Sequence, residues 1–261
     1  MIKHRQALAP IVWIGLLVGI WEICAQTEIV NPYILPPFSS VAQTLVAESI
    51  TGTLLLQALN SLWIIILGFL ISLAIALVVS IACVRYKVVD SFVSTLCAVF
   101  NPLPGIALIP LMMMWFGIGN GILVALIVHS ILWPLITNWT AGFRAIPAIY
   151  IEWGRNIELN TFQIVKDISL YAVMPYTLSG LIMGWGRAWR ALIAAEMIFG
   201  MIGSIGGIGQ YVYMARVYAN TEQVLAGILT VVIIGLIVEG VLFKKLEKIT
   251  IQKWGMSRAK A

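Results

Sequence analysis

The sequence predicts an all-α membrane protein with about six membrane-spanning helices, and composition and patterning carry this prediction. Of the 261 residues, 61% are hydrophobic and 10% are charged, whereas about a quarter of the residues in soluble domains are charged. The apolar segments are continuous and lack the alternation of polar and apolar residues that strands of a membrane β-barrel show. We therefore expect one helical transmembrane domain over residues 1–261.

Six apolar segments are candidates for membrane spans, because a helix needs about 20 mostly apolar residues to cross the ~30 Å hydrocarbon core. The second and third segments are longer than this, so we expect them to tilt or to project beyond the membrane. The six segments cover residues 8–23, 54–84, 89–116, 122–143, 173–199 and 224–243.

Lysine and arginine side chains are distributed unevenly between the two sets of loops. If the N-terminus is cytoplasmic, the external loops carry only Arg216. By the positive-inside rule, this distribution predicts that both termini are cytoplasmic. The net charge of +5 then follows from topology, so no nucleic-acid partner is expected. The cytoplasmic basic residues are Lys3, Arg5, Arg85, Lys87, Arg144, Arg155, Lys166, Lys244, Lys245, Lys248, Lys253, Arg258 and Lys260.

The sequence contains no pattern for catalysis or for a cofactor. It lacks the G-x-x-x-x-G-K-[ST] phosphate loop, the H-E-x-x-H zinc motif and the G-x-S-x-G nucleophile motif. His4 and His129 are far apart, and the three cysteines have no C-x-x-C spacing, so we expect structural thiols and no metal site. The chain is therefore predicted not to be an enzyme, and any energy from ATP must come from a partner subunit that binds it.

Proline residues interrupt the third apolar segment. Pro102, Pro104 and Pro110 each remove a backbone donor, so a single straight helix is not expected here. Broken helices occur within membranes where protein or a water-filled cavity satisfies the freed groups. This break, together with Met114 beyond it, is therefore a candidate for the wall or gate of a translocation pathway. The alternative is a packing bend in an ordinary span, with the methionine as adaptable core.

Two arginines lie deep in the fifth apolar segment. Arg187 and Arg190 are three residues apart, so they share a helix face and lie about 20–25 Å from the start of that segment. Charged residues at this depth usually face a cavity or a partner, so both arginines and Glu196 are candidates for the pathway. An unpaired arginine would favour an anionic solute. The alternative is that Glu196, Glu239 or Glu22 neutralises the arginines in intramembrane ion pairs.

Several motifs resemble one family over nearly the whole chain. The prolines at 102, 104 and 110, followed by W-F-G-I-G at residues 115–119, resemble the permease subunits of binding-protein-dependent ABC importers. The similarity is specifically to the nitrate, sulfonate and taurine branch. Four further motifs resemble the same branch: L-P-P at residues 35–37, G-R-A-W at 186–189, A-A-E-M at 194–197 and G-G-I-G at 206–209.

The resemblance implies a type I importer fold in a prokaryotic inner membrane, with the chain as the transmembrane subunit of an ATP-driven importer. The partners that it implies are ABC ATPase subunits, an extracytoplasmic substrate-binding protein, a second permease copy or paralogue, and membrane lipid. The expected solute is a small anion such as nitrate, bicarbonate, a sulfonate or taurine, although related permeases also carry neutral or cationic organic molecules.

A cytoplasmic loop of this family forms short helices that dock on the ATPase, and the resemblance places it at residues 144–172. Glu158 stands where the family has glycine. Because a left-handed conformation costs other residues about 1 kcal/mol or more, we expect a reshaped turn or a continued helix there. The loop is either specialised for its own ATPase or belongs to one half of an asymmetric pair; a solvated connector is the remaining alternative. The coupling candidates are Glu152, Glu158, Gln163, Ile164, Leu170 and Pro175.

Two functions of other classes remain open. An ion-coupled secondary transporter needs no ATPase and predicts uptake that follows an ion gradient. A non-transporting accessory membrane subunit predicts that mutation of Arg187 leaves uptake unchanged.

Overall fold

Every regular element in the computed structural model is a helix within the residues that the structure describes, which are 2–117, 119–199 and 206–254. The predicted all-α class is confirmed. Ile118, Arg258 and Lys260, which the sequence motifs and charge pattern included, lie outside these residues. The elements are α1 (Ile2–Gln26), α2 (Phe38–Ile50), α3 (Leu54–Arg85), α4 (Lys87–Phe100), η1 (Gly105–Leu108), α5 (Ile109–Phe116), α6 (Asn120–Arg144), α7 (Ala148–Asn156), α8 (Thr161–Gln163), η2 (Ile164–Ser169), α9 (Leu170–Phe199), α10 (Ile208–Val217), α11 (Thr221–Ile237), η3 (Val238–Phe243), α12 (Lys244–Glu247) and η4 (Lys248–Gln252).

Four helical stretches in the described part of the chain are long and apolar enough to cross a membrane. A bent pair, α4 with the helices of Gly105–Phe116, raises the number to five if the pair counts as one span, and α1 contains a shorter apolar stretch at Val12–Gln26. These six regions correspond to the six predicted segments. The four full-length spans are Leu54–Arg85, Asn120–Arg144, Thr161–Phe199 and Thr221–Gln252.

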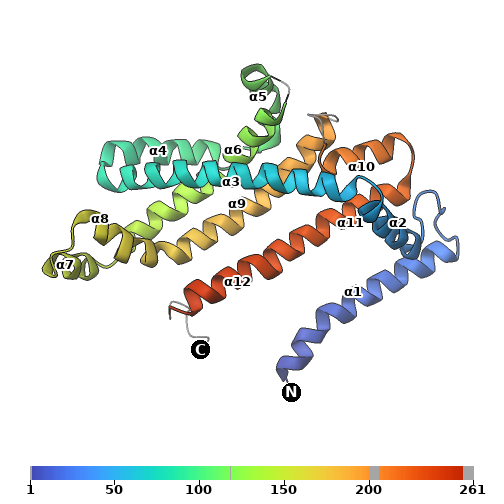
Figure 1. Ribbon diagram of the computed structural model, residues 1–261, viewed down its shortest axis with the longest axis horizontal. Helices are drawn as coiled ribbons and strands as arrows, with labels where there is room; N and C mark the ends of the chain where they lie inside the picture. The colour runs from blue at the N-terminus through green and yellow to red at the C-terminus, as the bar shows by residue number, and fades with distance from the viewer. Residues whose placement is uncertain (1, 118, 200–205, 255–261) are drawn as a thin grey trace.

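The third predicted segment is not one straight span. Its two halves meet at an angle of 97°, and α5 projects away from the bundle (Figure 1). Pro102 and Pro104 lie in the non-helical corner, where their missing donors prevent continuation of α4. Contrary to expectation, Pro110 does not bend a helix. It occupies the first turn of α5, where a backbone N–H would have no intrahelical acceptor, so a proline there costs no hydrogen bond.

Helices α3, α6 and α9 form the core of the bundle (Figure 1). Glycines bring the three backbones close together: Gly68 of α3 packs against Ile127 of α6, and Gly184 of α9 packs against Ile131. Both isoleucines are fully buried. Small residues at helix contacts are typical of membrane bundles, because lipid offers no hydrophobic driving force and close packing must supply the attraction.

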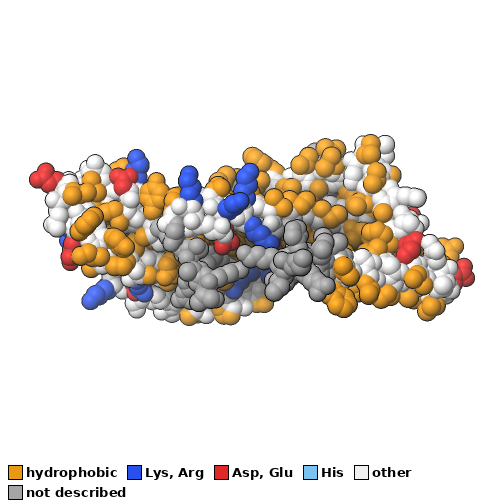
Figure 2. All heavy atoms as spheres, turned by 90° about the horizontal axis from the view of Figure 1, so that it is seen from below, with side chains coloured by type: hydrophobic (Ala, Val, Ile, Leu, Met, Phe, Trp, Pro, Cys, Tyr) orange, Lys and Arg blue, Asp and Glu red, His pale blue; other side chains and the backbone are white. Residues whose placement is uncertain are grey.

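The outer surface of the bundle is largely apolar. Large side chains such as Trp63, Leu70 and Val78 on α3 and Leu236 on α11 are more than half exposed, as expected for helices that face lipid. On the face shown in Figure 2, lysine and arginine side chains lie toward the left and centre. The left end carries α7 and α8 (Figure 1). The basic residues are therefore unevenly distributed along the bundle.

Candidate functional site

A cavity of about 420 Å³ opens where α6, α9 and the corner between α4 and η1 meet. Both predicted pathway arginines, Arg187 and Arg190, line it, and none of the described residues in its lining is acidic. Pro102 and Pro104 also line it, so the broken helix forms one wall of a cavity. The full lining is Phe100, Asn101, Pro102, Leu103, Pro104, Gly105, Ile106, His129, Ser130, Trp133, Arg187, Arg190 and Ala191.

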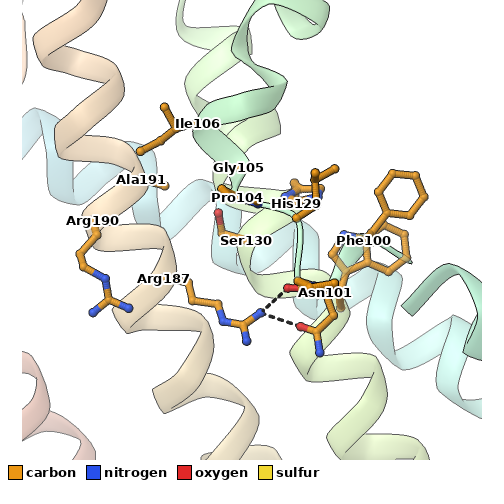
Figure 3. Close-up of a pocket in the computed structure, with 13 residues that line it drawn as sticks. Phe100, Asn101, Pro104, Gly105, Ile106, His129, Ser130, Arg187, Arg190 and Ala191 are labelled. Carbon is orange, nitrogen blue, oxygen red and sulfur yellow. Dashed lines mark hydrogen bonds between the residues drawn. The ribbon is translucent and has the colours of Figure 1, made fainter. Parts of the chain in front are cut away.

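The Arg187 side chain holds the corner of the broken helix. Its Nη1 donates to the backbone oxygen of Asn101 at 3.1 Å and to the side-chain Oδ1 of the same residue at 2.6 Å (Figure 3). Asn101 is the C-cap of α4, where the chain leaves the helix. Because the partner is a neutral amide and not a carboxylate, this contact brings no negative charge that would compensate the guanidinium.

Arg190 extends away from Asn101 on the other side of Arg187 (Figure 3). Among the described residues, no ion pair joins either arginine to a carboxylate. The acidic side chain of Glu239 on η3 lies in the neighbourhood of Arg190: its Oε1 and the Arg190 guanidinium nitrogens are all within 4 Å of the point where a Cβ on Gly186 would stand. Of the other two acidic candidates, Glu22 accepts hydrogen bonds from Ser39 at the start of α2. The third, Glu196, also has other partners.

Glu196 lies outside the cavity lining and serves a contact between helices. It is 3% exposed, and its carboxylate accepts from the Ser61 hydroxyl at 2.8 Å and from the Gly209 backbone N–H at 2.8 Å. Ser61 Oγ also accepts from the Ile208 N–H at 3.0 Å. These hydrogen bonds join the start of α10 to α3 and α9. The four residues that make them are all buried.

The remaining pathway candidates lie on α5. Pro110 and Met114 do not line the cavity, and Met114 is 81% exposed. Together with Trp115 and Phe116, which are also exposed, Met114 gives α5 an apolar surface. The structure therefore brings together four of the seven predicted pathway residues, which are Pro102, Pro104, Arg187 and Arg190.

Within residues 144–172, α7 is a separate short helix, whereas α8 and η2 run on into α9 as one continuous helix, Thr161–Phe199. Glu158 was expected to reshape the turn, but it adopts the left-handed conformation itself, with φ of 61°. The Leu159 N–H donates to the Gly154 oxygen at 2.9 Å, and the Glu158 N–H donates to the Arg155 oxygen at 3.0 Å. These two bonds form a Schellman motif that ends α7, and they hold a residue other than glycine in a strained position.

Other coupling candidates have structural roles that the sequence also encodes. Gln163 completes a capping box with Asn160, in which each side chain accepts from the other residue's backbone N–H. Ile164 is buried against Gly154, where an added Cβ would lie 3.1 Å from Ile164 Cγ1. Glu152, Glu158 and Leu170 are exposed, and Pro175 lies inside α9.

Sequence reasoning missed the polar cavity residues of α6. His129 has two buried ring nitrogens without a hydrogen-bond partner among the described residues, and its ring packs against Phe100 and Trp133. Ser130 lines the same cavity. Because Pro134 has no backbone N–H, the carbonyl oxygen of Ser130 has no intrahelical donor. The available signal was a histidine inside a long apolar segment, because ionisable residues at membrane depth usually serve function.

Comparison with known proteins decides the family. Residues 68–243 match the family described as the binding-protein-dependent transport system inner membrane component. The chain belongs to this family. Both the arginine-lined cavity and the helices α7 and α8 lie within the matched region.

Relatives of this permease agree with that assignment. It is 30% identical to a candidate ABC transporter permease of Methanocaldococcus jannaschii, over 91% of this chain and 89% of that protein. It is 28% identical to the taurine transport system permease of Escherichia coli, over 90% and 86% of the two chains. The nitrate import permease of Synechocystis is 24% identical, over 91% of this chain and 87% of that protein. The predicted nitrate, sulfonate and taurine branch is thus confirmed, and the permease is a multi-pass inner-membrane protein with the type I permease fold.

Proposed function

We propose that this permease is the transmembrane subunit of an ATP-driven importer that carries a small anion through the arginine-lined cavity. The observation that supports this most is the charge of the cavity, whose lining, in the part of the chain that the structure describes, includes Arg187 and Arg190 and no acidic side chain. A low-dielectric wall strengthens the attraction between such cations and an oxyanion. The names of the relatives indicate taurine and nitrate as solutes of those proteins, and both carry oxygen atoms that a guanidinium can bind.

The energy for transport comes from a partner ATPase that docks on α7, α8 and η2. Three large apolar side chains, Trp153, Ile157 and Phe162, are each at least two-thirds exposed on these short helices. Aromatic residues that are exposed in this way are typical of protein interfaces. Glu152 is exposed beside Trp153 and supplies a polar contact at the same surface.

The mechanism is alternating access. Closure of two ATPase subunits on ATP would move α7 and α8, and the continuous helix Thr161–Phe199 joins this loop directly to the arginines. An external binding protein delivers the solute, and a second permease copy or a paralogue completes the pathway. In this arrangement ATP is bound and hydrolysed by the partner.

Uptake by the reconstituted importer tests the proposal. The permease, its ATPase and its binding protein are placed in proteoliposomes, and the uptake of labelled nitrate and taurine is measured with and without ATP. We expect uptake of at least one of these solutes to need ATP and to persist when ionophores collapse all ion gradients. Uptake that requires an ion gradient and ignores ATP would establish a secondary transporter instead.

A further inference from the structure

Asn101 is shared by two cavities. It lines the arginine-lined cavity and also a second cavity of about 380 Å³ between α3, α4 and α6. It stands at the corner where α4 ends and the chain turns by 97°. The two cavities therefore share one lining residue, and Arg187 holds that residue through two hydrogen bonds.

The second cavity has polar walls of its own. Thr140 is 8% exposed, and its hydroxyl has no hydrogen-bond partner among the described residues. Buried hydroxyls almost always have a partner, so this group is available to a water molecule or a solute in the cavity. Arg144 and Asp90 form an ion pair at the same cavity, and Thr137 and Cys97 also line it.

The two cavities follow one another along α6. Ser130 lines the first and Thr140 lines the second, and ten residues of helix span about 15 Å. Beyond Thr140, α6 ends at Arg144, close to Asp90 at the start of α4. The second cavity thus lies between the arginine-lined cavity and the end of α6 that the loop of α7 and α8 follows.

An anion in the first cavity would compete with Asn101 for Arg187. A guanidinium binds an anionic oxygen more strongly than a neutral amide oxygen, because the full negative charge adds Coulomb attraction to the hydrogen bond. Binding of an anion therefore favours release of Asn101. Because the prolines on its C-terminal side leave Asn101 at the end of a helix, its side chain can move without breaking a continuous helix.

We propose that the two cavities are successive compartments of one solute route and that Asn101, held by Arg187, closes the passage between them. This inference rests on the proposed transport function and adds the identity of a gating residue and the position of the second compartment. A solute anion opens the passage by taking the place of Asn101 on Arg187.

Access to Cys97 tests the gate, because this native thiol lines the second cavity. A variant with Cys24→Ala and Cys83→Ala leaves Cys97 as the only cysteine. Energy-depleted intact cells that express the complete importer are treated from outside with a membrane-impermeant sulfonatoethyl methanethiosulfonate reagent. We expect slow labelling of Cys97, at least tenfold faster labelling after Asn101→Ala, and an unchanged rate after Thr95→Ala, which is on the same helix but lines neither cavity.

Two results would overturn the gate: rapid labelling without the Asn101 substitution, or an equal rate in the Asn101→Ala variant.

Saturating nitrate or taurine should also accelerate labelling. If neither solute does so while Asn101→Ala does, the gate stands and the proposed anionic solute is wrong. If Asn101→Ala does not assemble, Asn101→Asp carries the test. Its carboxylate binds Arg187 more strongly, so stimulation by the anion should be lost, and stimulation equal to that of the unsubstituted residue would contradict the proposal.

Discussion

Arg187 and Arg190 share one face of α9, but they have different surroundings. Arg187 is bound to Asn101, whereas Arg190 extends away from that pair toward the side where Glu239 lies. Arg190 is therefore the arginine that is more available to a solute, and Arg187 joins solute binding to the position of the broken helix.

Replacement of Arg190 should weaken solute binding without preventing assembly. A hydrogen bond to a charged group contributes about 1.5–3 kcal/mol, so Arg190→Ala is expected to raise the KM of ATP-driven nitrate or taurine uptake by about 10–100-fold. Arg216→Ala is the matched control, since Arg216 lies at the end of α10 and does not line the cavity. An unchanged KM in the Arg190 variant would contradict a solute contact.

Replacement of Glu239 should change the KM in the opposite direction. Its carboxylate lies near the Arg190 guanidinium without forming an ion pair, so it reduces the positive potential that a solute meets. Glu239→Gln removes this charge and should lower the KM for an anion by a few-fold at low ionic strength, with a smaller effect at high salt. A raised KM would show that the carboxylate positions Arg190 instead.

The sequence predicted the arginines but not their partner. A charged side chain inside an apolar segment is visible without coordinates, which is why Arg187 and Arg190 could be selected. The partner Asn101 is 86 residues away from Arg187, and the contact depends on the angle of the proline corner. Glu196 was also visible as a buried charge, but only the fold shows that Ser61 and Gly209 satisfy it.

At the scale of elements, the short helices of residues 144–172 depend on particular backbone positions. The family resemblance placed a turn at position 158 and indicated the strain of glutamate there, which left a reshaped turn and a continued helix as the two expectations. It could not show that two Schellman bonds and the packing of Gly154 on Ile164 would hold the left-handed conformation despite that strain. The turn was preserved because several contacts together outweigh about 1 kcal/mol of local cost.

Glycine at position 158 should stabilise this turn. Relief of left-handed strain, less the extra freedom that glycine gives the unfolded loop, leaves a gain of about 0.5–1 kcal/mol. We expect amide hydrogen exchange in residues 148–163 to slow by about two- to fivefold in Glu158→Gly. Glu28→Gly is the control, because Glu28 is also left-handed but lies after α1. Faster exchange in the Glu158 variant would be inconsistent with a strained turn.

The contact between α9 and α10 has no room for a side chain at position 209. A Cβ on Gly209 would lie 2.3 Å from the Ile193 backbone oxygen and 2.6 Å from Glu196 Cβ. Overpacking of this kind costs about 1–3 kcal/mol, so Gly209→Ala should lower the thermal unfolding midpoint in detergent by several degrees. Gly240→Ala should not, since a Cβ there has no neighbour within 4 Å. Equal midpoints for the two variants would contradict a close contact.

At the scale of the whole molecule, the two ends of the bundle differ in what they present. One end carries α7 and α8 with exposed Trp153, and the other carries the turn between α10 and α11 with exposed Tyr218 (Figure 1). The number of apolar segments and the helical class followed from hydropathy alone. The bend of 97° did not, because prolines predict a break in a helix but not the angle between its two halves.

The exposed tryptophan at the first end should anchor the ATPase. Truncation of a buried interface aromatic commonly costs more than 2 kcal/mol, so Trp153→Ala should reduce copurification of the ATPase with the tagged permease by at least about tenfold at limiting concentration. Tyr218→Ala is the matched control, since Tyr218 is 78% exposed, against 69% for Trp153, but lies at the other end. Native mass spectrometry of the purified assembly gives the composition, and we expect two ATPase copies with two permease subunits. If the ATPase is retained after Trp153→Ala and lost after Tyr218→Ala, the docking end has been assigned incorrectly, and if no ATPase copurifies with the unsubstituted permease, an ATP-driven importer is ruled out.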